Sequence, residues 1–553
     1  MDLDTAPTHP PGWFGTTLGE VCSKPQYGWT TKAKNGEGVR LLRTTDISSG
    51  SIDWDRVPAC SEIPKLLASY LLAENDIVIS RAGSVGLSYL LKCVPSQSVF
   101  ASYLIRFRPN LNINSRFIAF YLQSPAYWRM VREASVGIAL ANVNASKLEA
   151  FSLPLAPLLE QHRIVAEIER QFSLLDAGVA NLKRVQANLK RYRASVLQAA
   201  CTGQLVPTEA QLAQAEGRAY EPADVLLTRI LAERRARWEA EQLAKMEVQG
   251  KLPLNGAWKA KYQEPATPDM IGLPELPEGW AWASLSMMTS NIGDVDHKMP
   301  KAVPKGIPYV STKDFGGQND IDFDRAKRIS PEDYFALCRK IKPTCGDLLL
   351  SRYGTVGEVR YVRTEQPFQA SYSVAILKMI TSHTTTEYIL TLMRSSVVQT
   401  QVKRDIRATA QPDLGLDHIR KFVVSIPPLA EQERIVGEVE RRLSVVDNLE
   451  QVVKANLKRA ERLRQAILKE AFAGRLVPQD PADEPAGVLL ERIKAEQEAQ
   501  AAAKTGRRKE RPDASPGHND VAGTAVPSGH ARRKRGIADK ARLQPDLFSP
   551  DDR

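Results

Sequence analysis

A thirteen-residue phrase that occurs twice in this chain constrains its fold more than any other feature. Residues 160–172 read EQHRIVAEIERQF, residues 431–443 read EQERIVGEVERRL, and eight of the thirteen positions are identical. Weaker matches extend the similarity in both directions at nearly the same offset. The sequence therefore predicts two copies of one structural unit, at about residues 10–207 and 277–478.

Each copy begins with a mixed pattern of strands, turns and helices. DIVISRAGSVG at 76–86 and DLLLSRYGTVG at 347–357 are aliphatic runs that end in a glycine turn, as a strand does. The phrase ASY follows in both copies, at 101–103 and at 370–372. Amphipathic helical stretches come next, so the pattern predicts a compact α+β domain in each copy.

Each copy ends in one long predicted helix. Apolar residues recur at alternating spacings of three and four from Val165 to Val196 and from Val436 to Ile467, the pattern of a coiled-coil seam. About 40 residues at 1.5 Å each give a rod of roughly 60 Å, and two such rods in one chain most simply pack on each other. Polar residues that could fix the register interrupt the seam at Gln186, Arg193, Glu450 and Arg464.

The expected fold class is α+β. Two globular α/β domains are separated by two long antiparallel coiled-coil helices, with an internal pseudo-twofold repeat. A Pro-, Gly-, Ala- and Arg-rich tail should be disordered. The expected boundaries are 1–152 and 277–423 for the globular domains, 153–207 and 424–478 for the long helices, 208–276 and 479–504 for the connecting and C-terminal helices, and 505–553 for the tail.

The composition indicates a globular protein of a reducing compartment. The chain is 43% hydrophobic and 25% charged, and it has no apolar run of about 18 residues that would predict a transmembrane helix. Its N-terminus lacks the pattern of a signal peptide. The six cysteines include no CxxC pair. We expect a cytoplasmic protein, and the net charge of +11 is compatible with a polyanionic partner.

Motifs that would carry chemistry are missing from the sequence. There is no GxxxxGK[ST] loop for ATP phosphates, no HExxH zinc motif and no [DN]PP[YF] motif for a target amine. PDLGLDHIRK at 412–421 begins like a nuclease site but lacks the acidic-x-Lys half. We expect a non-catalytic chain that binds no metal and no cofactor.

Several phrases resemble one protein family closely. They are IPPLAEQERIVGEVERRL at 426–443, ANLKRAERLRQAILKEAFAGRLVP at 455–478, LPEGWAWASL at 276–285, SRYGTVG at 351–357, and their counterparts in the first copy. In these phrases the chain resembles the specificity subunit of a type I restriction–modification enzyme. The resemblance implies that the globular domains are two target-recognition domains that read an asymmetric, bipartite site in double-stranded DNA.

The same resemblance implies partner subunits. Two modification subunits would methylate adenine with S-adenosylmethionine, and two restriction subunits, which are motor–nucleases, would use ATP and Mg²⁺. The EQxR segments could be helix starts alone, because glutamate in a first turn favours the helix dipole. We predict instead that six of their residues lie at or near the interface with the modification subunits: Glu160, Gln161, Arg163, Glu431, Gln432 and Arg434.

Candidate DNA-binding residues fall in the glycine turns and in polar loops. Arginine can contact phosphate or guanine, and Asn and Gln can bond adenine. Because both copies keep the turn arginine, phosphate positioning or a role in the fold is favoured there over base reading. The candidates are Lys32, Lys34, Arg43, Thr45, Ser80, Arg81, Asn142, Asn144, Lys298, Lys305, Thr312, Lys313, Ser351, Arg352, Tyr353 and Gln411.

Two other interpretations stay open at this stage. The chain could be a coiled-coil scaffold that joins proteins without DNA, or a free-standing DNA-binding regulator that binds tightly on its own. Adjacent genes for an adenine methyltransferase and a helicase–nuclease would favour a specificity subunit. In addition, QPDLF at 544–548 resembles the short peptides that bind the bacterial sliding clamp, so the clamp is a further possible partner.

Overall fold

The computed structural model describes residues 9–135, 142–251, 253, 255–297, 299–317, 319–406 and 412–509. The first 487 residues form one compact unit. Of the second unit, the structure describes the remainder of the helix α15 (Ala486–Lys509). No helix within these ranges is long and apolar enough to cross a lipid bilayer.

Lobe 1, residues 9–156, is built on two sheets. One has the antiparallel order β2-β9-β6-β7, and the other has the order β3-β5-β4-β8 with β4 and β8 parallel. A separate antiparallel pair, β1 with β10, joins the start of the lobe to its end. The elements are β1 (Phe14–Thr17), α1 (Leu18–Val21), β2 (Gln26–Tyr27), β3 (Ala33–Lys34), β4 (Arg40–Leu42), α2 (Thr44–Ile47), β5 (Ala59–Cys60), α3 (Leu67–Tyr70), β6 (Ile77–Ser80), β7 (Ser88–Leu90), β8 (Ser98–Phe100), β9 (Leu104–Phe107), α4 (Ser115–Tyr121), α5 (Pro125–Ser135), α6 (Ala145–Glu149) and β10 (Ser152–Leu155).

Lobe 2, residues 277–427, repeats this topology. The orders β12-β18-β15-β16 and β14-β13-β17 correspond to β2-β9-β6-β7 and β5-β4-β8, and β13 and β17 are again parallel. The pair β11 with β19 corresponds to β1 with β10. The elements are β11 (Ala281–Ser284), β12 (Thr289–Gly293), β13 (Ile307–Val310), η2 (Thr312–Asp314), β14 (Lys327–Ile329), α10 (Pro331–Cys338), β15 (Leu348–Ser351), β16 (Val359–Tyr361), β17 (Gln369–Ala370), β18 (Val374–Met379), α11 (Thr386–Arg394), α12 (Ser396–Asp405), α13 (Leu416–Arg420) and β19 (Val423–Ile426). The predicted α+β class and internal repeat are confirmed.

The strand register corrects one detail of the repeat. The ASY phrases align Tyr103 with Tyr372 in the sequence. In the structure, Ser80 at the end of β6 pairs with Leu104, and Ser351 at the end of β15 pairs with Val374. The structural alignment of the two lobes is therefore shifted by one residue from the alignment of the phrases. The structural counterpart of Tyr372 is therefore Ser102, and the two lobes present tyrosine at different positions of this turn.

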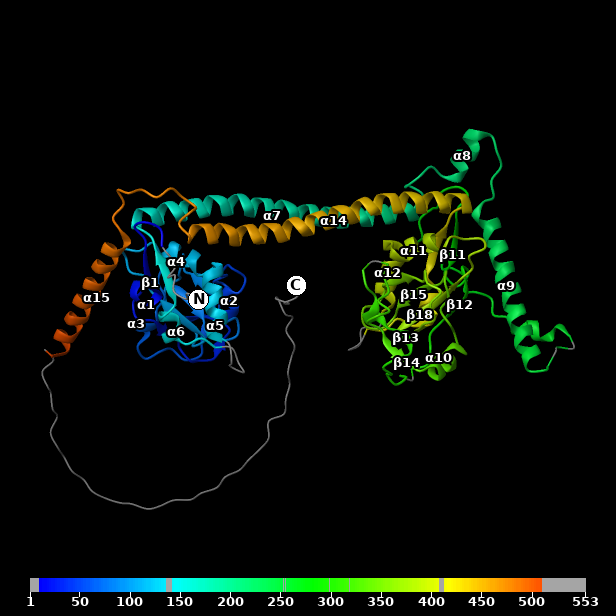
Figure 1. The fold of residues 1–553 in the computed structure, drawn as a ribbon. Helices are drawn as coiled ribbons and strands as arrows, with labels where there is room; N and C mark the ends of the chain where they lie inside the picture. The colour runs from blue at the N-terminus through cyan, green and yellow to red at the C-terminus, as the bar shows by residue number, and fades with distance from the viewer. Residues whose placement is uncertain are drawn as a thin grey trace, which may run out of the picture. The chain divides into compact units, whose positions relative to one another are not determined.

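The long helices α7 (Leu158–Cys201) and α14 (Leu429–Ala471) lie side by side (Figure 1). Leu189, late in α7, shares an apolar cluster with Val446 and Val453, near the middle of α14. Residues late in one helix therefore meet residues earlier in the other, so the helices are antiparallel. The predicted coiled coil is confirmed.

Two ion pairs across the seam are related by the pseudo-twofold symmetry of the repeat. Arg193 pairs with Asp447, and Arg464 pairs with Asp176. Adding the 271-residue offset to Arg193 and Asp176 gives Arg464 and Asp447, so the repeat converts each pair into the other. Arg193 also lies 3.4 Å from Glu450. Of the four predicted polar interruptions, Arg193, Glu450 and Arg464 thus bind across the seam and fix one antiparallel register, whereas Gln186 is exposed.

Buried glutamines attach each lobe to its own long helix. Gln161 accepts a hydrogen bond from the backbone N–H of Asn114 at 3.1 Å and donates to the carbonyl of Ala156 at 2.8 Å. Its counterpart Gln432 accepts from the backbone N–H of Thr385 at 3.2 Å and donates at 3.0 Å to the carbonyl just before its helix. Both glutamines are fully buried. They fix the angle at which the lobe's α4 or α11 meets the long helix.

The arginines of the same segments join each long helix to the segment that follows the other long helix. Arg163, early in α7, lies 2.6 Å from Asp483, in the segment that follows α14. Arg434, early in α14, lies 2.7 Å from Glu209, in the segment that follows α7. Burial opposes ionisation of Glu209, but Arg218 and Arg434 outweigh it and hold the pKa of that carboxyl below its usual value. The two copies are thereby linked at both ends of the coiled coil.

The connector between the copies carries α8 (Glu209–Glu216), α9 (Ala223–Val248) and the 3₁₀ helix η1 (Gly256–Lys261). The backbone N–H of Ala223, the first residue of α9, donates to the carbonyl of Gly279 at 2.8 Å. The first residue of α15 makes the equivalent bond to Gly12, also at 2.8 Å. The two helices therefore start in the same way, each at the opening turn of a lobe.

Each long helix ends against the opening proline of the other copy's lobe. Gly203 and Gly474 have φ of +69° and +68°, the left-handed conformation that favours glycine at a helix end. A Cβ atom at Gly203 would lie 2.4 Å from Cγ of Pro277, and one at Gly474 would lie 2.3 Å from Cγ of Pro10. The glycine after each long helix therefore packs on the first proline of the other copy's lobe, in PEGW at 277–280 or in PPGW at 10–13. The same contact occurs twice.

We expect Gly203→Ala to lower the melting temperature of the protein by several degrees more than Gly217→Ala. Both glycines have positive φ, but a Cβ atom at Gly217 meets nothing within 4 Å. Each substitution costs roughly 1–2 kcal/mol for the left-handed backbone, and only that at Gly203 also pushes against Pro277. Thermal unfolding followed by circular dichroism measures the difference, and equal shifts would mean that this contact contributes nothing.

Candidate nucleic-acid interface

Equivalent turns follow the central strand of the second sheet in both lobes. In lobe 1 the Asp46 carboxylate accepts from the backbone N–H of Arg43 at 2.8 Å and forms an ion pair with its guanidinium. In lobe 2 Asp314 accepts from the N–H of Ser311 at 2.7 Å. These bonds lock the two turns, residues 43–46 and 311–314, which we call the capped turns. They leave the residue before each aspartate exposed. Those exposed residues are the predicted candidates Thr45 and Lys313.

The glycine-turn serines have structural roles. Ser80 and Ser351 are fully buried. The Ser80 hydroxyl donates to the carbonyl of Ala82 at 3.0 Å, and the Ser351 hydroxyl accepts from the N–H of Glu358 at 2.8 Å. Sequence reasoning placed both among the DNA contacts because they sit beside a turn. The structure uses their side chains to close that turn.

The turn arginines also hold the fold together, to different degrees. Arg352 is buried, forms ion pairs with Asp294 and Asp413, and donates to the carbonyl of Leu414 at 3.0 Å. Its counterpart Arg81 is only half-buried. Arg81 reaches Asn142, the counterpart of Asp413, at 3.4 Å and lies 4.9 Å from the ring centroid of Tyr27. Of the two arginines, only Arg81 retains surface for a phosphate contact.

The remaining candidates of lobe 1 and lobe 2 are mostly exposed. Lys32, Lys34 and Lys305 lie on the surface. Asn144 caps α6, because its side chain accepts from the N–H of Lys147 at 2.9 Å. Two candidates, Lys298 and Gln411, lie outside the described residues, as does the segment 544–548.

Three predicted residues of lobe 2 come together around one open hollow of about 590 Å³. Thr312 and Lys313 enter it from the capped turn, and Tyr353 enters it from the glycine turn. His297 and Tyr372 complete an aromatic cluster that sequence reasoning missed. Their rings stack with centroids 4.8 Å apart, and Tyr353 meets both edge-on at 5.9 and 5.7 Å.

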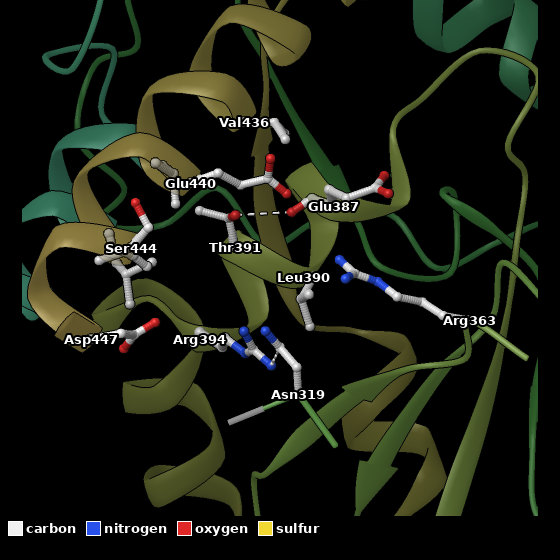
Figure 2. Close-up of a pocket in the computed structure, with 13 residues that line it drawn as sticks. Asn319, Arg363, Glu387, Leu390, Thr391, Arg394, Val436, Glu440, Ser444 and Asp447 are labelled. Atoms are coloured by element: carbon white, nitrogen blue, oxygen red, sulfur yellow. Dashed lines mark hydrogen bonds between the residues drawn. The ribbon is translucent and has the colours of Figure 1, made fainter. Parts of the chain in front are cut away.

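A second hollow lies where lobe 2 meets the long helices. Figure 2 shows Arg394 and Glu387 of α11 beside Glu440 and Asp447 of α14. Burial, together with the nearby Arg360, Arg193 and Arg363, lowers the pKa of Arg394 to about 10. Among the residues that line the hollow, the carboxylates of Glu387, Glu440 and Asp447 outnumber the two guanidinium groups, Arg363 and Arg394. This hollow is therefore a charged junction between lobe and helix, and it lacks the excess positive charge that an anion site needs.

The middle of the coiled coil exposes apolar side chains on one face. Four of them form two repeat-related pairs, Leu174 with Val445 and Tyr192 with Leu463. Each lies one position before or three positions after a seam residue, and these two positions share a face of the helix. The pseudo-twofold axis that exchanges the two antiparallel helices is perpendicular to the plane that contains them. Repeat-related residues of α7 and α14 therefore lie on the same face of the helix pair. We call this set, with Val185, Leu449 and Val452, the apolar face.

The partner-interface candidates divide by burial. Glu160, Gln161, Glu431 and Gln432 are buried. Burial raises the pKa of Glu160 and of Glu431, and Glu431 accepts hydrogen bonds from Nε1 of Trp280 at 3.0 Å and from the N–H of Glu209 at 2.8 Å. Arg163 and Arg434 remain partly exposed. A role of these six residues at a subunit interface stays a prediction.

No cluster of three or more potential metal-ligating side chains occurs among the residues that the structure describes.

The family model for the type I restriction modification DNA specificity domain matches residues 10–182 and 286–459, one match in each copy. Together these spans cover more than half of the chain.

Curated relatives and a solved structure agree with this match. The chain is 25% identical to the EcoKI specificity subunit of Escherichia coli strain K12, covering 85% of this chain and 91% of the relative. It is 24% identical to the EcoBI specificity subunit of Escherichia coli, covering 72% and 74%. A chain from a structural study of assembly in a type I restriction–modification system has the same fold, with a TM-score of 0.56 at 18% identity over 85% of this chain and 99% of that one. This chain belongs to the type I restriction–modification DNA specificity family and carries two copies of its recognition domain.

Proposed function

We propose that lobe 1 and lobe 2 each read one half of an asymmetric, bipartite site in double-stranded DNA. The observation that carries this proposal is the difference between the capped turns. Equivalent positions hold Arg43 and Thr45 in lobe 1 but Ser311 and Lys313 in lobe 2. Side chains that differ in charge and hydrogen-bonding groups on equivalent frames bond different base edges.

The coiled coil would set the distance between the two halves of the site. Its helices span 44 and 43 residues, which corresponds to roughly 65 Å at 1.5 Å per residue. The ion pairs that fix its register and the glutamines that fix each lobe on its helix oppose bending and sliding. A rigid separator of this kind specifies the number of unread base pairs between the half-sites.

The chemistry of the complex would belong to its partners. Two modification subunits would methylate adenine with S-adenosylmethionine, and two restriction subunits would cleave unmodified DNA with ATP and Mg²⁺. This chain would contribute recognition and assembly, with no cofactor of its own. The apolar face supplies a docking surface for the modification subunits, because its pseudo-twofold symmetry offers two identical partners equivalent contacts.

Sequencing of methylated bases in the host genome tests the reading function. We expect deletion of this gene to remove one bipartite methyladenine motif. We further expect Lys313→Glu to weaken or relax one half of that motif and Thr45→Glu to affect the other half, because each alters the turn of one lobe. If each variant changes both halves equally, the lobes do not read separate half-sites.

Co-purification tests the docking surface. We expect the double variant Tyr192→Asp/Leu463→Asp to lose most of the modification subunit that co-purifies with the wild-type chain, because two charges would be buried in an apolar contact. Ala187→Asp, at another exposed position of α7, should retain it. Circular dichroism should give equal helix content for all three proteins. Undiminished co-purification by the double variant would rule out this face.

A further inference from the structure

The hollow of lobe 2 has features that reading base edges in a groove does not require. It is lined by the stacked residues His297 and Tyr372, by the edge-on Tyr353, and by the serines Ser311, Ser371 and Ser373. Lys313 and Lys327 also line it. We propose that this hollow binds a nucleobase that has left the helical stack of the DNA.

The concave form of the site argues for an unstacked base. Paired bases present flat edges at the bottom of a groove, and such edges do not enter a hollow of about 590 Å³. An extrahelical base projects from the duplex and needs an aromatic surface for stacking and polar groups for its exposed edge. The tyrosine and histidine rings supply the first, and the hydroxyl groups supply the second. A lysine ammonium beside them suits the phosphate of the same nucleotide.

The rings are held in place from behind. The guanidinium of Arg352 lies 4.6 Å from the ring centroid of Tyr353 and is itself fixed by Asp294 and Asp413. The hydroxyls of Ser371 and Ser373 lie 2.6 Å apart and hydrogen-bond to each other, which fixes the turn on either side of Tyr372. Arg352 is thus a positioning residue for this hollow.

Lobe 1 cannot form the same site. The counterpart of Tyr353 is Ala82, and the strand register makes Ser102 the counterpart of Tyr372. Tyr103, one residue further along, is 63% exposed and has no ring partner among the described residues. Capture of an unstacked base therefore belongs to lobe 2 alone, and it distinguishes the two halves of the bound DNA.

This inference rests on the proposed DNA-reading function and has a separate test. The probes are two fluorescent duplexes of the same mixed sequence, one with a single unpaired adenosine bulge and one with an abasic nucleotide at the bulge. We expect the full-length chain to bind the adenosine bulge about tenfold more tightly, within the range of base–aromatic stacking. Tyr372→Ala should abolish the difference, and Tyr372→Phe should keep it.

Tyr103→Ala is the matched control in lobe 1 and should leave the tenfold preference unchanged. Equal binding of the two probes by the wild-type chain would overturn the proposal. So would a Tyr372→Ala variant that loses affinity for both probes and for an unbulged duplex to the same extent, since that result would indicate contact with the sugar–phosphate backbone. Loss of the methyladenine motif on gene deletion is unaffected by either outcome, so failure here is distinct from failure of the reading function.

Discussion

The antiparallel packing of α7 on α14 is the contact on which the rest of the molecule depends. An apolar seam alone would tolerate sliding by a heptad. The ion pairs Arg193–Asp447 and Arg464–Asp176 select one register, because a shift would separate both pairs at once. Surface ion pairs add little stability, so their contribution here is to specificity of alignment. Every contact at the ends of the helices presupposes that alignment.

At those ends, the phrases that occur in both copies form contacts that hold the lobes and the helices together. Gln161 and Gln432 fasten a lobe to the helix that follows it, and Arg163 and Arg434 fasten the helix to the other copy. The sequence predicted the two copies and the seam because apolar spacing and repetition are local signals. It did not predict that the glutamines are buried, since one partner of each, the backbone N–H of Asn114 or of Thr385, lies 47 residues away in the chain.

The candidate site was predictable only in part, and for the same reason. The capped turns were identified from loop polarity and the glycine turns from their repetition in both copies, and Thr312, Lys313 and Tyr353 do meet around one hollow. Whether a turn residue points outward depends on packing, and in Ser80, Ser351 and Arg352 it points inward. His297 and Tyr372 were missed because stacking brings together residues 75 positions apart in the chain.

The proposed asymmetric, bipartite DNA site and the proposed pair of identical partner subunits place opposite demands on one chain. Recognition requires two different surfaces, whereas docking of identical partners requires two equivalent ones. The duplication separates these demands physically. The helices keep repeat-related ion pairs and an apolar face with repeat-related residues, whereas the lobes keep one topology but differ at Thr45 and Lys313 and at Ala82 and Tyr353. Because the glutamines bind backbone groups of each lobe and not its exposed turns, those turns can change without disturbing the dimer-like frame.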